Sequence, residues 1–102
     1  GVIRKMDDNK KEIYAQMMER LILHLCKRTD VQNIDIMNLA GFCRNCLSKW
    51  YVEAAKDKNI NIDYEKAREL IYGMPYSDWK SKYQTKATED QLESRKMQEK
   101  EN

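Results

Sequence analysis

Two cysteines, Cys43 and Cys46, stand three positions apart in the string C-R-N-C. On a helix, side chains at this spacing share one face, so their sulfurs are expected to be neighbours. Neighbouring thiols support two chemistries: reversible oxidation to a disulfide, and binding of a metal ion such as zinc or iron. A four-ligand zinc site in one chain would also need His24 and Cys26, which are two positions apart and therefore point in different directions.

The same pair also fits a purely structural role. Cys43 and Cys46 fall on a stripe of apolar residues that runs to Trp50, and free cysteine is among the residue types most often buried. A redox C-x-x-C motif usually stands at a helix start within a βαβ pattern, whereas here the pair falls inside an expected helix. We therefore expect both sulfurs to fill space in the core. Redox chemistry, and metal binding by Cys43, Cys46 and His24, are the alternatives.

Five polar residues around the pair form a second candidate site. A rigid guanidinium beside side-chain amides suits a carboxylate or a phosphate, so this group is a candidate pocket for a small anion. Short polar side chains also cap helix ends and tie loops to helices. We favour capping over anion binding for this group, which comprises Asn33, Asp35, Asn38, Arg44 and Asn45.

Aromatic residues near Pro75 form a third candidate site. Tyrosine and tryptophan combine an apolar ring with a polar tip, which suits an exposed docking patch as well as a small buried cluster. The candidate docking residues are Tyr76, Trp79 and Tyr83.

Apolar residues recur at helical spacing in four stretches, which are the elements expected to position these side chains. Asp35 and Asp63 are expected N-caps, and Gly73, two residues before a proline, is expected to end a helix. Gly41 lies within the second stretch and is expected to kink that helix. The predicted helices cover residues 9–28, 35–59, 64–72 and 78–84.

These stretches predict an all-α fold, a compact irregular array of about four helices with a charged C-terminal extension. Charged residues make up 35% of the chain, and it contains three glycines and one proline, which favours helices over a turn-rich β fold. We expect residues 1–8 to be a flexible lead-in and residues 9–85 to form the helical domain. Residues 86–102 are expected to be a charged tail, either disordered or a helix bound to a partner.

Charge and hydropathy argue against several classes of partner and compartment. A net charge of +2 is too weak for the basic surface typical of nucleic-acid binding. The apolar run Leu21–Leu23 falls far short of a membrane span. Residues 1–12 are charged and lack an apolar stretch, so we expect no secretory signal peptide. Reduced thiols in a cytoplasmic or organellar compartment, for example the mitochondrion, are the expectation.

Two longer strings resemble a known family. Residues 29–51, T-D-V-Q-N-I-D-I-M-N-L-A-G-F-C-R-N-C-L-S-K-W-Y, and residues 67–80, A-R-E-L-I-Y-G-M-P-Y-S-D-W-K, resemble the domain of unknown function 1244, a family of short bacterial and eukaryotic proteins. The resemblance covers about residues 13–84, leaving residues 1–8 and 86–102 outside it. It implies a multihelical array of about four helices and no activity, because the family has no established function. The matching positions of most interest are Asp30, Asn33, Asp35, Asn38, Cys43, Arg44, Cys46 and Trp50.

The sequence shows no complete catalytic constellation, so we do not expect an enzyme. The lone histidine, His24, lies in an apolar helix and is expected to pack there. We predict an interaction domain or accessory subunit that binds a protein partner or another copy of itself. A thiol-redox or metal-binding protein using Cys43 and Cys46, and a small-anion-binding domain around Arg44, are the alternatives. No cofactor is expected, apart from zinc or iron under the metal-binding alternative.

Overall fold

The structure of the protein, a computed structural model, describes residues 2–101 and is all-α, as predicted. Within that range it contains six helices and no strand, where about four helices were expected. Two differences account for the change: the predicted helix over residues 35–59 is two helices, and the charged tail contains a helix. The helices are α1 (Val2–Lys27), α2 (Asn33–Ala40), α3 (Arg44–Asp57), α4 (Tyr64–Tyr72), α5 (Tyr76–Tyr83) and α6 (Glu89–Glu101).

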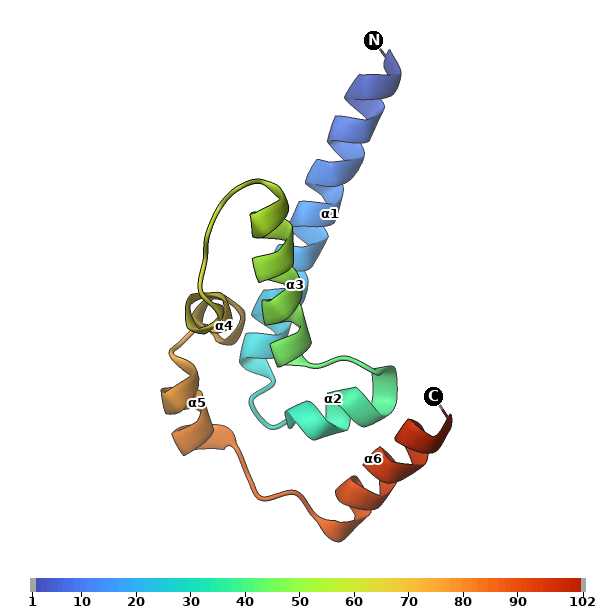
Figure 1. Ribbon diagram of the computed structural model, residues 1–102, viewed down its shortest axis with the longest axis vertical. Helices are drawn as coiled ribbons and strands as arrows, with labels where there is room; N and C mark the ends of the chain where they lie inside the picture. The colour runs from blue at the N-terminus through green and yellow to red at the C-terminus, as the bar shows by residue number, and fades with distance from the viewer. Residues whose placement is uncertain (1, 102) are drawn as a thin grey trace.

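The N-terminal half of α1 extends beyond the rest of the molecule (Figure 1). The helix begins at Val2 rather than near Asn9, so residues 2–8 are its first turns. Every side chain from residue 6 to residue 21 is exposed. The helix joins the hydrophobic core only near its C-terminal end, through Ile22 and Leu25.

A sharp break separates α2 from α3, so the expectation of one continuous helix was wrong. Gly41 adopts the left-handed conformation, with φ 78°, and its N–H donates to the carbonyl of Met37, which ends α2. The chain then runs extended through Cys43, whose φ is −150°. Residues 42 and 43 therefore lie outside any helix, and α3 starts afresh at Arg44.

The caps of α2 and α4 agree only in part with the sequence prediction. Gln32, not Asp35, is the N-cap residue of α2; the Asp35 carboxylate reaches back from the first turn and accepts the Gln32 N–H at 3.2 Å. Asp63 is the N-cap of α4, as predicted, and accepts the N–H of Lys66 at 2.8 Å. Gly73 ends α4 as predicted, with φ 76°.

The core lies where α3 and α4 pack together, with α1, α2 and α5 around them. Ala67 is fully buried, which lets α3 and α4 approach closely, and Trp79 of α5 is 1% exposed. Two residues expected on the inner stripe lie outside the core, since Leu39 is 89% exposed and Trp50 is 52% exposed. The buried cluster consists of Leu25, Ile36, Leu47, Ile71, Tyr72 and Trp79.

The charged tail folds back, and α6 lies against α2 (Figure 1). The contact is polar: the Gln91 side chain donates to Asp35 at 2.9 Å, and the Asn38 side chain donates to the Gln91 carbonyl at 3.0 Å. Before α6, the Gln32 amide bridges the connection by donating to the Tyr83 carbonyl and accepting the Thr85 N–H. The tail is therefore in contact with its own chain.

No helix within residues 2–101 combines the length and the apolar character that crossing a bilayer requires.

Candidate functional site

Arg44, at the first position of α3, is 1% exposed, although the predicted periodicity placed it away from the buried stripe. Its guanidinium donates to four oxygen atoms of the protein and lies over the Trp79 ring, with 4.9 Å to the ring centroid. Burial lowers the pKa of Arg44 from its ordinary value. Two of the acceptors are carbonyls at the C-terminal end of α1, so this side chain caps α1. The four acceptors are the carbonyls of Leu25, Arg28 and Val31 and the side chain of Asn33, at 3.4, 2.8, 2.8 and 3.1 Å.

A chain of side-chain hydrogen bonds continues from Arg44 to the first turn of α3. Asn33 accepts from Arg44 and donates to the Tyr72 hydroxyl at 2.9 Å. That hydroxyl donates to the Asn45 side chain at 2.7 Å. Burial of the ring raises the pKa of Tyr72 to about 12. The network ties α2, α3 and α4 together through three polar side chains that are not charged.

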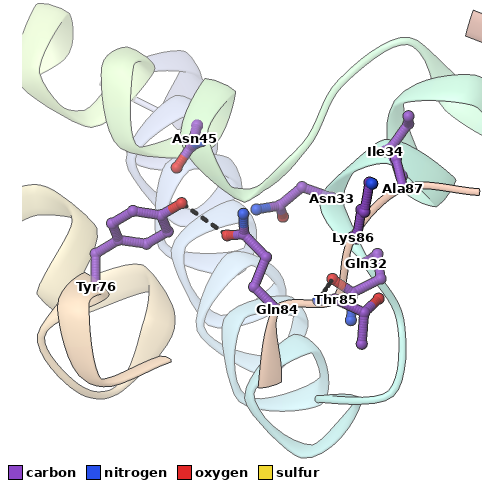
Figure 2. Close-up of a pocket in the computed structure, with 9 residues that line it drawn as sticks. All are labelled: Gln32, Asn33, Ile34, Asn45, Tyr76, Gln84, Thr85, Lys86 and Ala87. Carbon is purple, nitrogen blue, oxygen red and sulfur yellow. Dashed lines mark hydrogen bonds between the residues drawn. The ribbon is translucent and has the colours of Figure 1, made fainter. Parts of the chain in front are cut away.

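A polar cavity of about 310 Å³ adjoins this network, between the start of α2, the start of α3 and the α5–α6 connection. Figure 2 shows Asn33, Asn45, Tyr76 and Gln84 around it, with Tyr76 donating to the Gln84 side chain at 2.8 Å. Lys86 contributes the one cationic side chain among the lining residues.

The structure divides the predicted polar site into three parts. Asn33 and Asn45 line the cavity, whereas Arg44 lies beside it and is bound by the protein. Asp35 and Asn38 contact α6 instead. The capping interpretation therefore describes Arg44, and the cavity contains residues that the sequence did not single out. Gln32, Gln84 and Lys86 come from loop and terminal positions, where periodicity carries no information about neighbours.

The two cysteines lie at the start of α3, and the prediction that both fall inside a helix was right for Cys46 and wrong for Cys43. Cys43 is the N-cap residue, and Cys46 belongs to the first turn. Their sulfurs are 3.9 Å apart. Cys43 is buried and Cys46 is partly exposed. Burial raises the pKa of Cys43, and the backbone N–H groups of Cys46 and Asn45 partly offset that effect.

The remaining candidate ligands do not join this pair. His24 is exposed rather than packed in the core. Cys26 donates to the Ile71 carbonyl at 3.3 Å, and burial raises its pKa. Among residues 2–101, no three histidine, cysteine or acidic side chains are grouped as they would be to hold a metal ion. Any metal site at Cys43 and Cys46 would therefore need ligands from outside this part of the chain.

The aromatic residues near Pro75 form a buried cluster, and Trp79 cannot belong to an exposed docking patch. The Trp79 ring packs edge-on against Tyr72, at 5.2 Å between centroids, and against Tyr83 at 5.8 Å. Tyr76 and Tyr83 are half-buried and pack against the core. Pro75 is the N-cap residue of α5, the helix that carries Tyr76, Trp79 and Tyr83.

An exposed apolar surface lies instead on α1, along a helix whose apolar periodicity is typical of a buried face. Its residues have exposed fractions between 38% and 64%. They are separated by three, four and seven positions or adjacent, so they form one stripe along the helix. We call this stripe the α1 face: Met6, Ile13, Tyr14, Met17 and Leu21. The pattern itself was visible in the sequence, but no segment of the described chain covers it.

Comparison with known proteins also separates α1 from the rest of the molecule. A family model described as a protein of unknown function (DUF1244) matches residues 31–98. No curated protein matches the chain. The match includes α2 to α5 and most of α6, with Arg44 and both cysteines of the pair, and it begins after α1. Compared with the predicted extent of 13–84, it starts later and includes tail residues up to 98. The chain therefore belongs to the DUF1244 family.

Proposed function

We propose that the protein is a non-enzymatic interaction domain and that the α1 face is its docking surface, occupied by α1 of a second copy. The observation that carries this proposal is the exposure of Met6, Ile13 and Met17, each at 58% or more, on a helix that projects from the domain. Soluble monomers rarely expose a continuous apolar stripe of this kind.

The projecting half of α1 has little to hold it helical within its own chain. Isolated helices shorter than about 12–15 residues are marginal in water, and most helical stability in proteins comes from packing an apolar face. None of the residues 6–21 is buried in the described chain. A partner against the α1 face supplies the packing that the domain itself does not.

The spacing of the α1 face favours a second copy over an unrelated partner. Met6 precedes Ile13 by seven residues, and Leu21 follows Tyr14 by seven, so these four of the five residues are symmetric about the midpoint between Ile13 and Tyr14; the position that mirrors Met17 is Lys10. An antiparallel pair related by a twofold axis therefore places Met6 against Leu21 of the second copy and Ile13 against Tyr14. Antiparallel packing also places the positive end of each helix dipole beside the negative end of the other, which is favourable.

The area of the α1 face is compatible with a small dimer interface. Its five side chains expose roughly 500 Å² together, against about 800 Å² that each partner buries in a typical stable interface. The aliphatic stems of flanking residues such as Lys10, whose ammonium lies over the Tyr14 ring, supply further contact area.

We do not propose small-anion binding at Arg44, because its guanidinium already donates to four oxygen atoms of the protein. An anion there would have to displace carbonyls that α1 needs for capping.

The oligomeric state of the full chain tests the proposal. We expect light scattering coupled to size-exclusion chromatography to give a dimer for the wild type. The double variant Ile13→Glu/Met17→Glu should be a monomer, because it would bury four carboxylates in the apolar centre of the pair.

Ala15→Glu is the control, because Ala15 is exposed on the opposite side of α1 and the variant adds one of the two negative charges that the double variant adds. This variant should remain a dimer, and circular dichroism should show all three proteins folded. A wild type that stays monomeric up to about 100 µM overturns the proposal, as does a dimer that survives the double variant.

A further inference from the structure

We propose that Cys43 and Cys46 are a reversible dithiol–disulfide pair that reacts with small-molecule disulfides of the glutathione class, with Cys46 as the attacking thiol and Cys43 as the resolving thiol. This inference is independent of the α1 face. It stands on the position of the pair at the start of α3 and on the 3.9 Å between the sulfurs.

The geometry of the α3 start brings the sulfurs close without any help from the rest of the fold. Cys43 has extended backbone geometry as the N-cap residue, and Cys46 lies three positions on, in the first turn. A disulfide bond is about 2.05 Å long, so each sulfur has to move by roughly 1 Å to form it. Because both residues belong to one helix start, that movement requires no rearrangement between helices.

Accessibility assigns the roles of the two thiols. Cys46 is partly exposed, so a small disulfide can reach its sulfur, whereas Cys43 is 7% exposed. Cys43 holds its proton more firmly than an ordinary thiol, because burial raises its pKa. Its S–H can therefore donate to the Cys46 sulfur, which lies 3.9 Å away.

The start of α3 also favours the second step. The backbone N–H groups of Cys46 and Asn45 lower the pKa of Cys43, although burial outweighs them, and the N-terminus of a helix stabilises negative charge. These donors stabilise the Cys43 thiolate when it forms. The cation nearest along the chain, Arg44, makes its hydrogen bonds to α1 and to the chain between α1 and α2, and it is not needed for this step.

The reaction consumes one small disulfide and releases two small thiols. The Cys46 thiolate attacks one sulfur of the disulfide; a Cys46–sulfur bond forms, the original sulfur–sulfur bond breaks, and the first small thiolate leaves and takes a proton. The Cys43 thiolate, its proton given to water, then attacks the Cys46 sulfur. The Cys43–Cys46 bond forms and the second small thiolate leaves, so two protein thiols are oxidised and one disulfide is reduced.

Thiol counting and intact-mass measurement on the full chain test the proposal with oxidised glutathione as the probe. The reduced wild type has three thiols, and we expect one to remain, with the mass lower by two hydrogen atoms. Cys26→Ala should still lose two thiols. Cys43→Ala should stop at a stable mixed disulfide on Cys46, and Cys46→Ala should react with the probe at least about tenfold more slowly than Cys43→Ala.

A second measurement needs no variant and so does not depend on their folding. Brief alkylation of the reduced native wild type, followed by peptide mapping, should label Cys46 before Cys43. A wild type that keeps all three thiols after prolonged incubation with excess oxidised glutathione overturns the proposal. Labelling of Cys43 first, or a mixed disulfide that accumulates in Cys46→Ala instead of Cys43→Ala, overturns the assignment of roles.

Discussion

Arg44 shows how one residue can have a role opposite to the one its type indicates. Its charge and its position in the predicted periodicity placed it among surface or pocket residues, yet it is 1% exposed. The error came from the helix boundary: with α3 starting at Arg44, the side chain turns back to the end of α1. A buried guanidinium is tolerated when protein acceptors satisfy it, and four oxygens do so here.

Tyr72 is the residue whose protonation is most closely tied to folding. Tyr72 is 2% exposed, and this burial makes the folded state favour the neutral ring. The hydrogen bond that Asn33 donates to its hydroxyl acts in the opposite direction and offsets part of the effect. Its pKa rises from 10.0 to about 12 on folding. Below pH 10 the proton is present in both states, whereas between pH 10 and 12 the unfolded chain loses it first. Stability is therefore complete below pH 10 and decreases as the pH rises through this window.

Replacing Tyr72 by phenylalanine should remove this alkaline sensitivity. In the wild type the ionisation contributes a decrease of roughly 1 kcal/mol per pH unit to the free energy of unfolding above pH 10. Tyr72→Phe should be less stable at neutral pH, because two hydrogen bonds are lost, but its stability should decrease less steeply above pH 10. Urea unfolding followed by circular dichroism measures both; equal slopes for the two proteins would contradict the buried-tyrosine account.

At the level of elements, local chemical signals predicted some helix ends and missed others. Asp63 and Gly73 were correctly predicted because an aspartate N-cap and a glycine C-cap act through their own backbone geometry. The start of α3 was missed because Cys43 is not a typical N-cap residue and its side chain makes no capping bond to the helix. The projection of α1 was missed because periodicity shows an apolar face but not what covers it.

The two C-cap glycines provide a matched test of backbone strain against packing. Gly41 and Gly73 have φ values of 78° and 76°, so alanine at either position should cost about 1 kcal/mol from the left-handed backbone alone. A Cβ at Gly41 meets nothing within 4 Å, whereas one at Gly73 lies 3.2 Å from the Cys26 sulfur. Gly73→Ala should therefore cost about 1 kcal/mol more.

A double variant separates the two contributions. Adding Cys26→Ala removes the crowded sulfur, so Gly73→Ala should then cost about as much as Gly41→Ala, measured against Cys26→Ala alone by urea unfolding. Equal costs of the two single glycine variants would show that the Cys26 contact is relieved without loss of stability.

At the level of the whole molecule, α1 and α6 differ from the packed centre, because most of their described side chains are exposed. The centre is held by α3 packing on α4 and by the buried cluster around Trp79. α6 is held by hydrogen bonds to Asp35 and Asn38, and its Leu92 and Met97 are 48% and 57% exposed. The all-α class followed from composition, but the docking of α6 on α2 depends on single polar contacts that no periodic pattern encodes.

Amide hydrogen exchange should show that the packed centre and α6 differ in local stability. We expect the amides of α3 and α4 to exchange slowest, through global unfolding, and those of α6 to exchange fastest, through local opening. In the monomeric variant Ile13→Glu/Met17→Glu, the first turns of α1 should also exchange quickly. Protection of α6 equal to that of α3 would contradict this ranking and would show that the polar contacts hold the tail more firmly than their number indicates.

The hydrogen bonds of Arg44 attach the C-terminal end of α1 to the start of α3, next to the cysteine pair. Arg44 donates to the carbonyls of Leu25 and Arg28, so the start of α3 and the C-terminal end of α1 are bonded to each other. With 26 residues, α1 is about 39 Å long, and a tilt of about 5° at its base moves its far tip by about 3 Å. A small change in the angle between α1 and α3 would therefore displace the far end of α1 much more than its base.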